Sequence, residues 1–124
     1  MGRMGRIVKD GSGWRLGWEP DATEYQGLVG TDDWVIELTG AELDDFCFLL
    51  GQLDRTMREM AFELMDQEKI VCEAESDLMW MEVEGYPSAY TVRFILNQGR
   101  RCEGCWLPQA VPGLVEAVHS LKVF

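Results

Sequence analysis

The sequence predicts an α+β fold of two antiparallel four-stranded sheets, with a long central helix and a short C-terminal helix. Three observations predict it: an amphipathic stretch at residues 39–66, four strand-like runs before it, and four more runs followed by a second helical stretch. The order strand-strand-strand-strand-helix thus occurs twice, in pseudo-repeat halves of about residues 1–66 and 67–124 that share no convincing sequence identity. A chain of 124 residues has the size of a single domain.

The first four runs are residues 6–10, 14–19, 25–29 and 34–38. Turn-forming residues at 11–13 and 30–33 separate runs that are rich in β-branched and aromatic side chains. In the last run Trp34, Ile36 and Leu38 fall on one side of the strand, because side chains alternate between the two sides. This pattern indicates a sheet with one side packed on a helix.

The long helix begins with a capping box formed by Thr39 and Glu42, in which each side chain accepts a hydrogen bond from the backbone of the other. Apolar residues then recur at steps of three and four, which places them on one stripe of a helix. The predicted stripe comprises Leu43, Phe46, Cys47, Leu50, Leu53, Met57, Met60, Ala61 and Leu64. A helix of this kind needs a sheet on which to bury its stripe.

The second half contains runs at residues 68–75, 78–84, 90–97 and 102–107, with a loop predicted at 85–89 and a helix at 111–123. Leu78 and Trp80 lie on one side of their strand, and Met79, Met81 and Val83 lie on the other. Both sides of this strand are therefore apolar near its start. One side packs on the helix, and the Leu78 and Trp80 side requires the other sheet, a dimer partner or a ligand to cover it.

The net charge is −11, and it is unevenly distributed. Residues 19–84 carry nineteen acidic and three basic side chains, whereas both ends of the chain are mildly basic. The acidic middle opposes the binding of nucleic acid.

No run is long and apolar enough for a membrane span, and the first ten residues lack the apolar core of a secretory signal. We therefore expect a cytoplasmic protein with free thiols and no membrane association.

Chemical motifs are sparse. Cys102 and Cys105 form a single C-x-x-C pair, whereas a structural zinc site needs four ligands, and the pair lies in a strand-like run instead of at the start of a helix. A metal or redox role for the pair remains open beside the simpler interpretation of two thiols near the surface. His119 is the only histidine and has no nucleophile beside it. We therefore expect a protein that is not an enzyme and needs no metal or cofactor.

A cationic group of Arg93, Arg100 and Arg101 is the candidate contact for nucleic acid. Single-stranded nucleic acid binds where basic side chains follow the phosphates and aromatic rings stack on the bases, and the chain has five tryptophans. However, three of them alternate in phase with apolar residues, as in a sheet packed on a helix. Arg93 is also a candidate to pair across the strands with either Glu82 or Glu84.

Four stretches carry a resemblance to a known family: GSGWRLGWEP at 11–20, LVGTDDWVIELT at 28–39, LMDQEKIVCEAESDLMWMEVEGYP at 64–87 and RFILNQGRRCEGCW at 93–106. The chain resembles a small cyanobacterial family of uncharacterised proteins. The resemblance implies a Whirly-like fold, that of the single-stranded-DNA-binding transcriptional regulators, which is built from tandem strand-strand-strand-strand-helix units. The lysine-rich Lys-Gly-Lys-Ala-Ala-Leu stretch of the Whirly proteins is absent from this sequence.

These observations favour a non-enzymatic binding or adaptor protein that acts through a protein partner or as a homodimer, with Leu78 and Trp80 on the partner surface. The alternative is a single-stranded nucleic-acid binding or transcription-related protein that uses Arg93, Arg100 and Arg101. A third candidate is a small-molecule pocket between the sheets.

Overall fold

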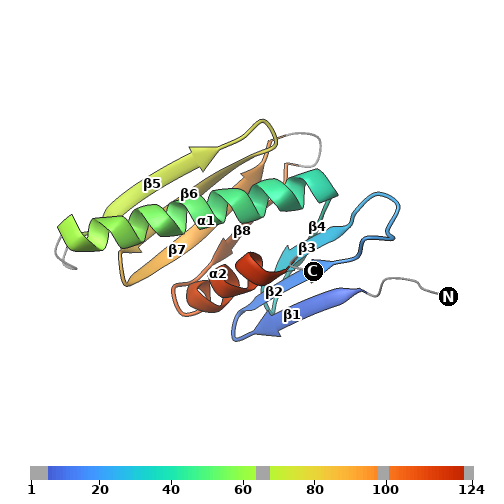
Figure 1. Ribbon diagram of the computed structural model, residues 1–124, viewed down its shortest axis with the longest axis horizontal. Coiled ribbons are helices and arrows are strands. Elements are labelled where there is room, and N and C mark those ends of the chain that lie inside the picture. The colour runs from blue at the N-terminus through green and yellow to red at the C-terminus, as the bar shows by residue number, and fades with distance from the viewer. Residues whose placement is uncertain (1–5, 64–67, 98–100, 122–124) are drawn as a thin grey trace.

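The computed structural model describes residues 6–63, 68–97 and 101–121, which form two four-stranded antiparallel sheets and two helices (Figure 1). In both sheets the strands lie in sequence order, β1-β2-β3-β4 and β5-β6-β7-β8, so each sheet is a meander. The predicted fold class, including the long central helix and the short C-terminal helix, is confirmed.

The first sheet consists of β1 (Ile7–Gly11), β2 (Trp14–Trp18), β3 (Gly27–Gly30) and β4 (Val35–Leu38). Its buried side carries Leu16 opposite Val29, and Leu38 is also fully buried. Val35 on the other side of β4 is 44% exposed, so the predicted alternation of this run is confirmed.

Helix α1 (Gly40–Glu63) starts directly after β4. The predicted capping box is present: the backbone N–H of Glu42 donates to Thr39 Oγ1 at 3.1 Å, and the backbone N–H of Thr39 donates to Glu42 Oε1 at 2.9 Å. The apolar stripe is buried from Leu43 through Met57, except that Cys47 is only partly buried. Met60 is partly buried and Ala61 is exposed, because the last turns of the helix extend beyond the core. Leu64 lies outside the described residues.

The second sheet consists of β5 (Ile70–Glu75), β6 (Met79–Tyr86), β7 (Ala89–Leu96) and β8 (Glu103–Trp106). The loop predicted at 85–89 is shorter than expected, because β6 continues through Tyr86, which pairs with Ala89. Gly85 permits this continuation, since its φ of 145° lies in a region that other residues rarely adopt. Helix α2 (Val111–Ser120) follows β8 and has a proline in its first turn, as predicted.

Each helix covers the sheet of the other half. Helix α1 follows the first sheet in sequence, but it packs mainly along β5 and β6 of the second sheet, and α2 packs mainly on β2 of the first sheet and on α1 (Figure 1). The two halves therefore share one hydrophobic core.

An aromatic cluster joins the halves at the centre of this core. Trp106 is completely buried, stacks on Phe94, and donates a hydrogen bond of 2.8 Å from its ring N–H to the backbone carbonyl of Gly30 in the first sheet. The rings of Trp34 and Phe46 pack on it at centroid distances of 5.1 and 5.5 Å. Aromatic pairs in such arrangements stabilise a core beyond the area that they bury.

Candidate functional site

The outer side of the second sheet is acidic. Residues alternate along its strands, so that Met79, Met81 and Val83 are buried while their neighbours in β6 point outward. The same outward side of the sheet carries five glutamates. We name this side the glutamate face, defined by Glu73, Glu75, Glu82, Glu84 and Glu103.

The strand register brings these carboxylates close together. Glu73 of β5 lies directly opposite Glu82 of β6, and like charges at opposed positions destabilise a sheet. Two cations offset part of this charge: Arg93 pairs with Glu82 at 3.6 Å, and Lys69 pairs with Glu84 at 3.1 Å. The glutamate face therefore keeps a negative excess.

Trp80 lies in the middle of the glutamate face. Its ring N–H donates to Glu73 Oε1 at 3.1 Å, and the guanidinium carbon of Arg93 lies 5.0 Å from the centre of its ring. The other four tryptophans belong to the core or pack against it, whereas Trp80 does not. The guanidinium of Arg93 thus contacts both the ring of Trp80 and the carboxylate of Glu82. This combination is favourable for a guanidinium or ammonium group.

Of the two predicted partner residues, Trp80 lies on this outer side. Trp80 is partly exposed in β6, and Leu78 is partly buried just before the strand. Within the described chain, the side chains of Arg93 and Glu73 contact Trp80. The side chain of Trp80 is thus partly covered by residues of its own sheet.

Two of the three predicted nucleic-acid contacts, Arg93 and Arg101, lie within the described residues. Arg93 projects from the middle of β7 into the glutamate face, where Glu82 compensates its charge. Arg101 is exposed before β8, with a φ of 49° in the left-handed region. Arg100 lies outside the described residues.

The two cysteines of the C-x-x-C pair differ in environment. Cys102 is partly buried and packs against the core, whereas Cys105 points outward from β8. Burial raises the pKa of the Cys105 thiol, although Arg93 opposes the shift. A raised pKa lowers the fraction of reactive thiolate at neutral pH. The described residues contain no group of three or more side chains that is suited to hold a metal ion.

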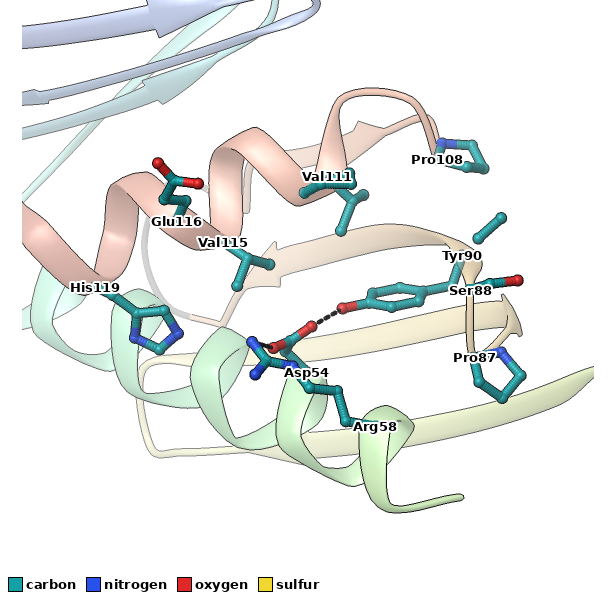
Figure 2. Close-up of a pocket in the computed structure, with 12 residues that line it drawn as sticks. Asp54, Arg58, Pro87, Ser88, Tyr90, Pro108, Val111, Val115, Glu116 and His119 are labelled. Atoms are coloured by element: carbon teal, nitrogen blue, oxygen red, sulfur yellow. Dashed lines mark hydrogen bonds and ion pairs between the residues drawn. The ribbon is translucent and has the colours of Figure 1, made fainter. Parts of the chain in front are cut away.

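A second candidate region is a cleft of about 400 Å³ between α1, the turn that joins β6 to β7, and α2 (Figure 2). Three of the four prolines of the chain line it, together with valines of α2. The polar lining comprises Asp54, Arg58, Ser88, Tyr90, Glu116 and His119.

A buried carboxylate lies at the base of this cleft. Asp54 is 8% exposed, and Tyr90, which is 6% exposed, donates its hydroxyl to Asp54 Oδ1 at 2.5 Å. Arg58 pairs with Asp54 Oδ2 at 2.5 Å, one helical turn further along α1. Burial and, next, the hydrogen bond to Asp54 raise the pKa of Tyr90 far above its usual value.

Asp54 was not among the residues that the sequence singled out. Its position nevertheless carries a signal, because it follows Leu50 by four residues and precedes Met57 by three, which places it beside the apolar stripe of α1. A carboxylate at such a position needs a buried partner. The sequence did not show that Tyr90 is that partner, since the two residues are separated by 36 positions.

Neither described helix is long and apolar enough to span a membrane. Comparison with curated proteins gives no match. Residues 9–121 match the profile of a family described as a domain of unknown function, DUF1818. Among solved structures, the chain is similar to a protein of unknown function from the DUF155 family of the cyanobacterium Prochlorococcus sp. NATL2A, with 26% identity and a TM-score of 0.90 over 96% of this chain and 100% of that chain.

Proposed function

The chain belongs to the DUF1818 family, and from this premise we propose that it is a non-enzymatic binding or adaptor protein that holds a positively charged segment of a protein partner on the glutamate face. The observation that carries the proposal is the direct opposition of Glu73 and Glu82 beside Trp80. Repulsion between the two opposed carboxylates destabilises the protein alone. A cation that binds between them removes this repulsion.

The contact of Arg93 with Trp80 and Glu82 indicates how such a partner is held. A lysine or arginine side chain from a partner can pair in the same way with the other carboxylates of the face. Val71, which is 52% exposed, and Ile95 offer apolar contact between the charges. The partner segment therefore combines basic side chains with apolar or small ones.

A second candidate, the binding of single-stranded nucleic acid, is supported by the order of elements. Two consecutive strand-strand-strand-strand-helix units are the arrangement that we expect of a Whirly-like fold. In that case Arg93, Arg100 and Arg101 contact the phosphates. The negative excess around Arg93 favours the protein partner over this alternative. The four cysteines are thiols and form no disulfide with one another, which is consistent with a reducing compartment, and we include a cytoplasmic location in the proposal.

Fluorescence anisotropy distinguishes the two candidates. A labelled twelve-residue peptide of alternating lysine and threonine and a labelled oligothymidine are titrated with the protein at low salt and then across a salt series. We expect saturable binding of the peptide, weakened by salt, and no binding of the oligonucleotide. Binding of the oligonucleotide that is lost in Arg93→Ala would contradict the proposal and support the alternative.

A matched pair of variants localises the binding. Glu82→Gln removes a charge from the glutamate face, whereas Glu59→Gln removes a charge from an exposed position of α1. The two proteins have the same net charge. Weaker binding by Glu82→Gln alone supports the glutamate face as the site, and equal weakening in both variants would mean that only the overall charge of the protein attracts the peptide.

A further inference from the structure

The cleft between the two helices lies apart from the glutamate face, and it combines an apolar wall with two basic side chains. We propose that it binds a small organic anion whose body is an aromatic ring or a short hydrocarbon, and whose charged group lies between Arg58 and His119. This site is independent of the proposed docking of a protein partner.

The apolar wall is formed by rigid or compact side chains. Pro87 lies in the β6–β7 turn, Ala89 begins β7 and Pro108 precedes α2. Val111 and Val115 project from α2 toward the cleft (Figure 2). A cleft of about 400 Å³ lies within the size range of small-molecule sites, about 300 to 1,000 Å³. Because proline and alanine side chains lose little conformational freedom on binding, this wall is preformed for an apolar ligand.

Arg58 provides the first cation. Its ion pair with the nearly buried Asp54 fixes the guanidinium at the cleft, while the side chain remains 68% exposed. A guanidinium has five N–H donors, and among the described residues the ion-pair partner of Arg58 is Asp54, so donors remain for a ligand. A cation that is already held in place loses less conformational entropy when an anion binds.

His119 provides the second donor from the opposite wall. In Figure 2 its ring points from α2 toward α1, and a methyl group in place of the hydrogen of Gly51 would lie 3.6 Å from His119 Cε1. This is an ordinary contact distance, so the imidazole lies against α1 beside Gly51. Glu116, the other charged residue of α2 in the lining, points away from the Asp54–Arg58 pair (Figure 2).

The charges favour an anion over a cation. Both carboxylate oxygens of Asp54 are engaged, Oδ1 by the hydroxyl of Tyr90 and Oδ2 by Arg58. A cationic ligand would have to displace Arg58 from a nearly buried carboxylate. An anionic ligand instead adds a partner to Arg58, and the N–H donors there form charge-assisted hydrogen bonds with a carboxylate.

The probe is benzoate, and the measurement is a titration of the complete chain followed by ¹H–¹⁵N correlation NMR, with benzyl alcohol and benzylamine as neutral and cationic controls. We expect saturable shifts in the backbone signals of Ala89, Tyr90, Val115 and His119. Benzoate should bind at least tenfold more tightly than either control, which corresponds to one charge-assisted contact.

Three variants test the role of the charges. Arg58→Gln should weaken benzoate binding about tenfold, and Arg55→Gln, an exposed arginine on the same helix outside the cleft lining, should leave it unchanged. Arg58→Gln also removes a partner of the nearly buried Asp54. A second variant therefore changes His119, which is exposed, so that the core is preserved. His119→Gln should weaken benzoate binding several-fold.

Two results would overturn the proposal. One is the absence of saturable shifts at the cleft up to the solubility limit of benzoate. The other is equal affinity for benzoate and benzyl alcohol in the original protein, because the basic side chains would then make no contribution.

Discussion

The two sides of the second sheet are built from alternating residues of the same strands, yet they differ in almost every property. On the inner side Met81 and Phe94 lie opposite each other and are completely buried under α1. On the outer side the neighbouring Glu82 lies opposite Arg93 and next to a like-charged Glu73. The inner side accounts for the fold, whereas the outer side contains charges that stability alone does not require. This difference is the basis of our proposal that the outer side binds a partner.

The largest effect is expected on the inner side. Phe94→Ala removes a ring that packs on Phe46 at 5.4 Å and on Trp106 at 5.6 Å, and it should lower the free energy of unfolding by about 3 to 5 kcal/mol. The control is Ile95→Ala, one residue further along β7 on the outer side, which should cost less than about 1.5 kcal/mol. Urea denaturation measures both. Equal losses in the two variants would contradict the assignment of the two sides.

The same denaturation curves test whether the halves form a single domain. Because each helix covers the sheet of the other half, we expect tryptophan fluorescence and far-UV circular dichroism to give the same midpoint. Two separate midpoints would divide the chain into independent units near residue 66.

An intermediate effect is expected where a polar contact is buried beneath the cleft. Tyr90→Phe removes the hydroxyl that donates to Asp54 and should lower the free energy of unfolding at pH 7 by about 1 to 2 kcal/mol. Thr91→Val, at the next position and on the outer side, is the control and should change stability less, because the hydroxyl there is only partly buried.

The dependence of this effect on pH has a defined sign. The pKa of Tyr90 is higher in the folded protein than its ordinary value of about 10, first because of burial and then because of Asp54. Its contribution is therefore complete below pH 10 and is lost as the pH rises from 10 toward the raised value, by up to about 1.4 kcal/mol per pH unit. Above pH 10 the free energy of unfolding should therefore fall more steeply with pH in the unsubstituted protein than in Tyr90→Phe. Parallel curves of this free energy against pH for the two proteins would show that folding does not raise the pKa of Tyr90.

The smallest effect is expected on the outer side, and its sign is opposite. Glu73→Gln removes one member of the like-charged pair and keeps the oxygen that accepts from Trp80, so the free energy of unfolding should rise by up to about 0.5 kcal/mol at low salt. Glu75→Gln is the control, because Glu75 lies opposite Trp80 and not opposite a carboxylate. Salt should reduce the difference between the variants. A clear loss of stability in Glu73→Gln would mean that the carboxylate stabilises the fold.

The elements of this fold were predictable from the sequence because each depends on residues close together in the chain. Alternation in the run of Trp34, Ile36 and Leu38, and the spacing of Thr39 and Glu42, require no knowledge of distant residues. The sequence also showed that the central region is acidic. It did not show which of the acidic residues lie on the same surface.

The candidate sites were less predictable because they depend on register and on contacts between distant elements. The opposition of Glu73 and Glu82 follows from the pairing of β5 with β6, which fixes the position of every outward residue. The partnership of Asp54 with Tyr90 joins α1 to β7. The sequence correctly indicated that Arg93 lies opposite a glutamate, and it left open whether Glu82 or Glu84 is the partner.

The most direct test removes three charges of the glutamate face together. In a protein with Glu73→Gln, Glu82→Gln and Glu84→Gln, both the free energy of unfolding and the affinity for the lysine–threonine peptide are measured in the same buffer. If the outer side is shaped by binding, stability is unchanged within about 1 kcal/mol and affinity falls at least tenfold. A protein that loses stability but binds the peptide as tightly as before would show that these glutamates serve the fold and not a partner.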